Sequence, residues 1–252
     1  MIKTKIITME VDVTALQSAA DRILGLVCAK QGAYICVSNV HMCMETFDSL
    51  PFRKVVNSAD LVIADGRPIS WAQQLMGHDS ARQVRGQDIM SALCEKSNNS
   101  ELSVGFYGGS SEAVLQKIQH NLKQQFPNIK ITYAYAPPFR ALSDEEDGQV
   151  IESINSANVD VLFVGIGCPK QEYWMSEHRD SLSCVMLGVG AAFDFIAGNK
   201  KHAPRWVQKI GLEWLFRLLS EPKRLWKRYL KQNPRFIYYF ARQLIKHKMT
   251  NA

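Results

Sequence analysis

Short apolar runs alternate with longer stretches of helical periodicity along most of this chain. The clearest runs are mostly apolar, are closed by a glycine or a polar residue, and cover 34–37, 61–64, 103–107, 160–164 and 183–187. Runs of this kind predict strands that are buried on both faces. Because amphipathic stretches of helical length separate them, the pattern indicates a doubly wound, mostly parallel α/β sheet of the Rossmann-like type.

Weaker signals complete this picture. Strands are also predicted at 6–11 and 129–135, and the amphipathic stretch at 14–30 predicts the first helix. Further helices are predicted through 42–47, at 69–76 and 87–96, from about 112 to 126, and from 143 onward. No internal repeat or low-complexity segment interrupts the order, so residues 1–199 are expected to form one Rossmann-like domain.

The pattern changes after Ala203, where the strand signals stop. A helix is predicted from Trp206 to Leu219, a second begins at Ser220-Glu-Pro222, and Asn233-Pro234 predicts a restart into a third. From Lys200 onward there are 14 Lys and Arg against two acids, a net charge of +12, whereas the preceding part carries −6. Residues 200–252 are therefore predicted to form a basic helical appendage.

The appendage places apolar and basic side chains on opposite faces of its second predicted helix. This arrangement suits a helix that lies in a membrane interface. A helix that packs its aromatic residues on the preceding domain and solvates its charges explains the same pattern. Both interpretations stay open, and the scarcity of acids favours contact with an anionic surface. The two faces consist of Leu225, Trp226, Tyr229 and Leu230, and of Lys223, Arg224, Lys227, Arg228 and Lys231.

Composition narrows the class of protein. The six cysteines are irregularly spaced without a CxxC pair, which indicates reduced thiols and gives little support to a disulfide framework or a zinc site. No run approaches the roughly 18 apolar residues of a membrane span, and the first residues show no export signal. A cytoplasmic protein is expected.

Polar or glycine residues follow four of the predicted strands: Ser38-Asn39, Asp65, Gly108-Gly109 and the turn 167–172. The carboxyl ends of parallel strands lie at one edge of a sheet, so these groups are expected to converge. Asp65 follows an apolar strand directly, and partial burial there would raise its pKa into the range of a general base. The residues alone favour a turn-capping role for Asp65, and Ser38 and Asn39 could likewise either bind substrate hydroxyls or cap a helix.

Other motifs are less specific. Gly108-Gly109 suits the approach of a phosphate to a helix N-terminus, but βα turns use glycine anyway. Gly165-Ile-Gly167 begins like a dinucleotide fingerprint, and Pro169-Lys170 interrupts it where the third glycine should stand. No Asp-x-Asp occurs, and the histidines lack metal-ligand spacing, so neither a metal nor another cofactor is expected.

Taken together, the motifs resemble the WecG/TagA/CpsF glycosyltransferases, glycosyltransferase family 26. They occur in one order over most of the chain, which makes the match specific. The matching pieces are Ala64-Asp65-Gly66, Arg85-Gly-x-Asp88, Tyr107-Gly-Gly109, Gly165-Ile-Gly-Cys-Pro-Lys-Gln-Glu172, Gly188-Val-Gly-x-x-Phe-Asp194, Ala203-Pro-x-Trp206, Gly211-Leu-Glu-Trp-Leu-Phe-Arg217 and Glu221-Pro-x-Arg224.

The resemblance implies an inverting, metal-independent enzyme on the inner face of the cell membrane. It would transfer N-acetylmannosamine, its uronic acid or a related hexose from a UDP-sugar to a polyprenyl-diphosphate-linked saccharide during cell-surface polysaccharide synthesis. The basic appendage would dock on the membrane surface and complete the active site. Nucleic acid is not an expected partner, and a homo-oligomer stays open.

The resemblance also implies roles for individual residues. Asp65 would deprotonate the acceptor hydroxyl, and Ser38 stands beside it where many members have threonine. Three arginines of the appendage would neutralise the leaving diphosphate: Arg217, Arg224 and Arg228. The substrates would be bound by Asn39, Arg85, Gly108, Gly109, Lys170, Gln171, Glu172, Gly188, Gly190 and Asp194.

Two departures from the common family pattern leave the donor sugar open. His41 stands where many members have an acid, and Ser110-Ser111 follows Gly109 where a further glycine is common. The stretch Arg67-Pro-Ile-Ser-Trp71 resembles the capsule and exopolysaccharide members more than the teichoic-acid members. Two other classes remain as alternatives: a nucleotide-dependent oxidoreductase, and a nucleic-acid-binding protein that uses the +12 appendage.

Overall fold

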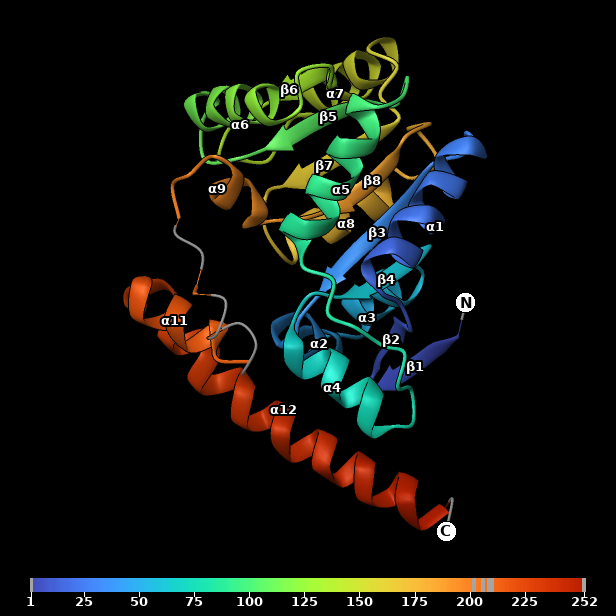
Figure 1. The fold of residues 1–252 in the computed structure, drawn as a ribbon, viewed down its shortest axis with the longest axis vertical. Coiled ribbons are helices and arrows are strands. Elements are labelled where there is room, and N and C mark those ends of the chain that lie inside the picture. Colours follow the sequence, from blue (N-terminus) through green and yellow to red (C-terminus); the bar gives the residue numbers. More distant parts are fainter. Residues whose placement is uncertain (1, 201–202, 205–206, 208–210, 251–252) are drawn as a thin grey trace.

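The computed structural model describes residues 2–200, 203–204, 207 and 211–250. Its centre is a six-stranded parallel sheet with the strand order β4-β3-β8-β7-β5-β6 (Figure 1). This sheet confirms the predicted α/β, Rossmann-like class. The strands are β3 (Ala33–Ser38), β4 (Leu61–Ala64), β5 (Ser103–Gly108), β6 (Lys130–Tyr135), β7 (Val161–Gly165) and β8 (Val185–Gly188).

Helices cover both faces of the sheet, because neighbouring residues of each strand point to opposite sides. Ile35 and Val37 of β3 belong to one buried cluster, and Tyr34 and Cys36 belong to the other. The first face is covered by α1 (Leu16–Cys28), α5 (Gly86–Asn98), α6 (Glu112–Gln125) and α9 (Ala192–Ile196). The second is covered by α2 (Val40–Asp48), α3 (Leu50–Asn57), α4 (Arg67–Leu75), α7 (Asp144–Ser156) and α8 (Lys170–Glu177).

The prediction of a single strand at 6–11 is wrong. The segment is a hairpin of β1 (Lys3–Ile6) and β2 (Met9–Asp12), which pair antiparallel outside the main sheet. Ile7 forms the turn with a φ of 59°, a conformation that β-branched residues rarely adopt. The apolar residues of this segment, Ile6, Met9 and Val11, all join the second cluster.

Two details of the helices differ from the prediction. Helix α3 was not predicted; it begins after Ser49, whose hydroxyl accepts a hydrogen bond from the Phe52 N–H. The predicted restart at Pro234 is wrong, because α12 (Pro222–Thr250) runs through it without a break. Pro234 and Leu230 are both exposed, so water can reach the Leu230 carbonyl that loses its intrahelical partner.

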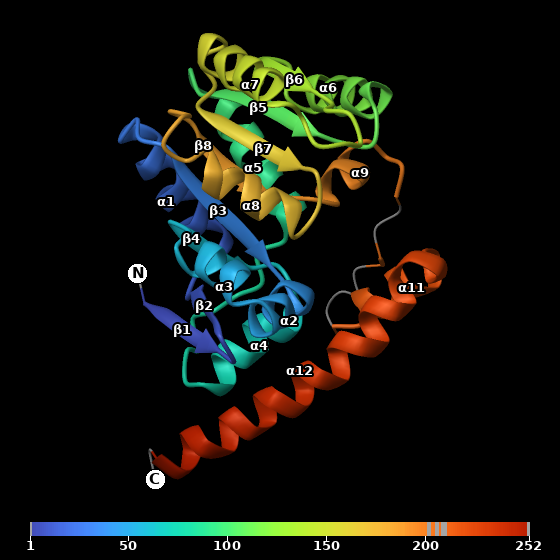
Figure 2. The same cartoon turned by 180° about the vertical axis from the view of Figure 1, so that it is seen from behind.

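The other described helix of the appendage is α11 (Glu213–Ser220). Of the helix predicted from Trp206 to Leu219, α11 confirms the part from Glu213, whereas Gly211, with a φ of 77°, lies before this helix; most of residues 205–210 lie outside the described residues. Both figures show α12 as one long rod beside the domain (Figure 2).

The inner face of α12 packs on the domain. Phe236 and Phe240 are 5% and 8% exposed and join the cluster that contains α2. Arg235 forms a two-pronged ion pair with Asp48 at the end of α2, at 2.8 and 2.5 Å. Of the apolar face predicted at 225–230, Leu225 is buried in the same way, whereas Trp226 and Leu230 are 46% and 65% exposed. The domain boundary at residue 199 stays a prediction.

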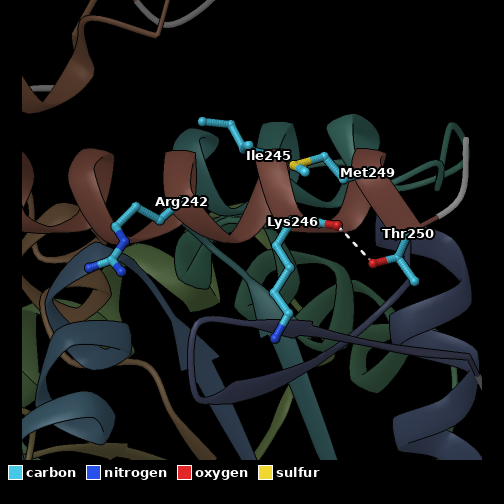
Figure 3. Close-up of a pocket in the computed structure, with 5 residues that line it drawn as sticks. All are labelled: Arg242, Ile245, Lys246, Met249 and Thr250. Atoms are coloured by element: carbon cyan, nitrogen blue, oxygen red, sulfur yellow. Dashed lines mark hydrogen bonds between the residues drawn. The ribbon is translucent and has the colours of Figure 1, made fainter.

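The outer face of α12 is exposed and mixes apolar with basic side chains. In the last turns, Ile245 and Met249 are 61% and 78% exposed and point away from Lys246, as Figure 3 shows. These residues, with Arg242 and Thr250, line a hollow of about 480 Å³. No helix in the described part of the chain is long and apolar enough to cross a membrane.

Replacing Phe236 by Ala should lower the free energy of unfolding by about 3–5 kcal/mol, because the truncation leaves a cavity between α12 and α2. Urea denaturation measures this change. Ile237 is the matched control, since it is 66% exposed on the same helix and its replacement by Ala should change stability by about 0.5 kcal/mol or less. Equal effects of the two changes would mean that α12 does not pack on the domain in solution.

Candidate active site

Asp65 follows β4 directly and lies at the N-terminus of α5. Its Oδ1 accepts a hydrogen bond from the backbone N–H of Gly86, the first residue of that 13-residue helix, at 2.9 Å. Its own backbone N–H donates to the Ser38 carbonyl at 2.8 Å. The side chain does not cap α4, the next helix in sequence, which has no side-chain capping bond. No described residue donates a hydrogen bond to Oδ2, so this oxygen is available to take up a proton.

The surroundings of Asp65 shift the pKa of its carboxyl group. Burial raises the pKa of Asp65 to about 6, although the Gly86 N–H and the charge of Arg217 act in the opposite direction. A carboxylate with this pKa is largely ionised at neutral pH and still binds a proton far better than an exposed aspartate. The raised pKa is compatible with the predicted role of Asp65 as a base, and that role stays a prediction.

Helix α11 brings two opposite charges to Asp65. Glu213 and Arg217 lie one turn apart, and both affect the Asp65 carboxyl: Arg217 lowers its pKa and Glu213 raises it. Glu213 also lies 3.9 Å from Arg85, which is bonded to Asp88 at 2.8 Å. Glu213 was not among the predicted site residues, although its i, i+4 spacing from Arg217 places the two on one helix face.

Contacts with α9 hold α11 in this position. The Arg217 guanidinium lies over the Phe195 ring, 5.6 Å from its centroid. Lys200 bridges Asp194 at 2.5 Å and Glu221 at 3.1 Å. The predicted substrate ligand Asp194 is therefore engaged with the chain's own lysine.

A second contact joins the appendage to the strand ends at Asn39. The Oδ1 atom of Asn39 caps α2 by accepting hydrogen bonds from the backbone N–H groups of His41 and Met42, at 3.0 and 3.3 Å. The same oxygen accepts a hydrogen bond from Nη2 of Arg228 at 3.2 Å. Asn39 thus both caps α2 and contacts the appendage. Arg228 lies at the end of β3, and Arg217 acts on Asp65 at the end of the neighbouring strand β4.

The turn before α8 is built around Gln171. Its side-chain oxygen accepts the Gly167 N–H at 3.2 Å, and its nitrogen donates to Glu172 Oε1 at 2.7 Å. A Cβ atom on Gly188 would lie 2.8 Å from the end of the Met175 side chain and 2.9 Å from the Gln171 amide nitrogen, so a larger residue there would require both side chains to shift. Gln171 and Gly188 therefore have structural roles at the turn before α8. A direct contact of Gln171 with substrate would require its side-chain amide to break these hydrogen bonds.

Several other predicted site residues lie in structural positions. Ser38 is fully buried and donates to the Ile63 carbonyl at 2.7 Å, which joins β3 to β4. The Gly109 N–H donates to the Gly165 carbonyl at 3.0 Å, so it is not turned toward a phosphate. The catalytic role of Ser38 stays a prediction from the resemblance, and the phosphate role of Gly109 stays a prediction from the glycine pattern.

The remaining predicted residues are placed as follows. Gly108 lies against Gly165, with a φ of 120° and no room for a Cβ atom. Gly190, with a φ of 50°, lies close to Gln171. Lys170 is exposed at the start of α8. Arg224 lies in α12, but its side chain is outside the described part of the structure. Among the residues that are described, no three His, Cys, Asp or Glu side chains are grouped to hold a metal ion.

Comparison with known proteins agrees with this geometry. Residues 4–250 match the glycosyl transferase WecG/TagA/CpsF family. The chain belongs to this family. It is therefore a glycosyltransferase, which removes the oxidoreductase and nucleic-acid-binding alternatives as its main activity.

Two relatives of this glycosyltransferase carry the same name, N-acetylglucosaminyldiphosphoundecaprenol N-acetyl-beta-D-mannosaminyltransferase. The protein from Bacillus spizizenii is 29% identical over 223 residues, which cover 88% of this chain and 82% of the relative. The protein from Staphylococcus aureus strain MW2 is 31% identical over 198 residues, which cover 78% of this chain and 75% of the relative.

Proposed function

We propose that this glycosyltransferase moves an N-acetylmannosamine-type sugar from a UDP-sugar to a polyprenyl-diphosphate-linked saccharide, with inversion and without a metal ion. The names of the two relatives support the acceptor and the transferred sugar. The observation that carries the proposal is the partly buried Asp65, which faces a cationic side chain of the appendage, Arg217.

In this mechanism, Asp65 takes the proton of the acceptor hydroxyl as that oxygen bonds to the anomeric carbon of the donor. The bond between this carbon and the diphosphate oxygen breaks on the opposite side, and UDP leaves with the electron pair. One carboxylate is sufficient, because a diphosphate is a good leaving group once its charge is neutralised.

Arginines of the appendage supply that neutralisation in our proposal. Arg217 lies near Asp65 and Arg228 lies at Asn39, so two guanidinium groups flank the strand ends where the donor would lie. Arg85 lies on the same side, at the N-cap of α5. Fixed cations of this kind stabilise developing charge in a transition state, a task for which other glycosyltransferases recruit a divalent cation.

The exposed face of α12 supports action on the inner face of the cell membrane. It combines Trp226, Leu230 and Ile237, which are 46%, 65% and 66% exposed, with lysines and arginines. Each basic residue near an anionic leaflet contributes about 1 kcal/mol of attraction. A lipid-linked acceptor would then meet the active site at the surface that holds it.

The test is transfer to a synthetic short-chain prenyl-diphosphate N-acetylglucosamine, followed by mass spectrometry with a panel of UDP-hexosamines and their uronic acids. We expect one donor to give a product that is larger by one sugar residue. The rate should be unchanged in excess EDTA. Loss of activity in EDTA that magnesium restores would overturn the metal-free mechanism, and absence of product with every donor would overturn the substrate assignment.

A further inference from the structure

One polar side chain is buried on the inner face of α12. Gln232 is 5% exposed, and Phe236 and Phe240 continue the same face one and two turns later as apolar residues of the core cluster. A buried amide is less favourable than an apolar side chain unless its hydrogen-bonding groups find partners. The position of Gln232 therefore calls for a physical reason.

Both ends of the Gln232 amide are hydrogen-bonded. Nε2 donates to Oε1 of Glu45 on α2 at 3.4 Å, and Oε1 accepts from Nη1 of Arg235 at 2.9 Å. Arg235 is bonded in turn to Asp48 at the end of α2. The buried amide thus joins α12 to two carboxylates of α2, to Glu45 directly and to Asp48 through Arg235.

Polar contacts join α12 to α2 in the same order along both segments. The pairs are Arg228 with Asn39, Gln232 with Glu45, and Arg235 with Asp48. Gln232 lies one turn after Arg228, so the two side chains occupy neighbouring positions on one stripe of α12. The attraction between apolar side chains has no preferred direction, so the phenylalanines alone leave the register open. A shift of α12 along α2 would carry Arg228 away from Asn39.

We propose that Gln232 is a positioning residue: its buried amide sets the register of α12 on α2 and thereby holds Arg228 at Asn39. A single buried polar side chain has this effect in coiled coils, where it fixes the register of two helices at a cost in stability. Gln232 affects transfer through Arg228, one turn closer to the strand ends. What Arg228 does in the reaction rests on the proposed function, but its place at Asn39 does not.

Gln232→Met tests the proposal, because methionine has a similar length and no amide. Transfer should fall by about 10- to 10²-fold, the effect of a small misplacement of a group that acts on the reaction. The melting temperature should stay the same or rise, since the side chain of Glu45 is 30% exposed to water and Arg235 keeps its bonds to Asp48. Wild-type transfer, or a loss of transfer that accompanies a lower melting temperature, would overturn the proposal.

Gln243→Met is the matched control on the same helix. The Gln243 amide also bonds to the domain, but its partners are backbone groups of the β1–β2 hairpin and not side chains of α2. Removing it should lower the melting temperature, because those backbone groups lose their partner. Transfer by the folded protein should stay close to that of the wild type. Loss of transfer as large as in Gln232→Met would contradict a special role of Gln232.

A combination with Arg228→Gln shows whether Gln232 acts through Arg228. If it does, the double variant should transfer no more slowly than Arg228→Gln alone. A purely structural defect would instead multiply the two losses. Multiplied losses would therefore exclude the positioning role.

Urea denaturation tests the register without any substrate. Asn39→Ser keeps a capping residue before α2 but shortens the side chain that Arg228 contacts. The effects of Asn39→Ser and Arg228→Gln on stability should be non-additive in the otherwise wild-type protein, since both remove the same hydrogen bond, and additive when Gln232 is also replaced by Met. The same degree of coupling with and without Gln232 would refute the proposal. A wrong assignment of donor or acceptor would leave this result intact.

Discussion

Replacing Asp65 by Asn should lower the rate of transfer by about 10²- to 10⁴-fold, because the amide keeps the size of the side chain but cannot accept the acceptor's proton. Steady-state kinetics with the short-chain acceptor measures the loss. Asp79→Asn is the control, since Asp79 is exposed in the loop after α4. Near-full activity of Asp65→Asn would assign Asp65 to joining β4 and α5 and would require another base.

The same substitution should increase stability above pH 6. Burial raises the pKa of Asp65 from 3.8 to about 6, so the folded state binds the proton more tightly than the unfolded state. This group therefore lowers stability as the pH rises through this window, by on the order of 2–3 kcal/mol once both states are ionised. Asp65→Asn should melt higher than the wild type at pH 8 and equally at pH 3.5. An unchanged difference across this range would contradict the raised pKa.

Replacing Arg217 by Gln should lower transfer by about 10²-fold or more, the usual cost of removing one fixed group that stabilises transition-state charge. The rising limb of the pH–rate profile should also move to higher pH, because Arg217 lowers the pKa of Asp65. This shift separates a role at Asp65 from a role in membrane attachment.

Arg242→Gln is the control for Arg217→Gln, because Arg242 lies in an exposed position near the far end of α12. Each change removes one positive charge, so binding to anionic liposomes should weaken equally in both, by about 1 kcal/mol. Only Arg217→Gln should lose transfer to a soluble acceptor. If the loss of liposome binding in Arg217→Gln fully accounted for its loss of transfer, Arg217 would serve only in membrane attachment.

Point variants test the appendage better than deletion. A chain cut after Ala203 loses the arginines of the appendage, but it also loses Phe236 and Phe240 from the core cluster. Its behaviour would combine a destabilised domain with an incomplete active site. A domain that unfolds more easily is the expected result of that deletion.

The sheet could be predicted because it depends on local signals, and so could the position of Asp65 at its edge. Asp65 stands between an apolar run and a glycine, and parallel strands bring such positions to one edge. The hairpin could not be predicted, because a strand signal at 6–11 gives no warning that Ile7 adopts a left-handed turn. The continuity of α12 through Pro234 was not predicted, because Pro234 is exposed only as a result of how the opposite face of this helix packs on the domain.

The roles of individual site residues were harder to predict, because they depend on contacts between distant parts of the chain. Asn39 was correctly placed at a strand end, but its bond to Arg228 spans 189 positions. Glu172 was predicted to bind substrate from its place in a motif. Its complete burial is a property of the packing around α8, which the motif does not contain.

The bond between Gln243 and Ile7 also bears on the order of synthesis. Gln243 accepts from the Ile7 N–H and donates to the Lys5 carbonyl, both at 2.7 Å, across 236 and 238 positions. The strained hairpin turn thus leaves the ribosome long before the helix that braces it. Contacts so far apart in sequence form late in folding. A nascent chain can complete its sheet while α12 is still being made, and the contacts of Arg228 and Gln243 with the domain form only after that helix has left the ribosome.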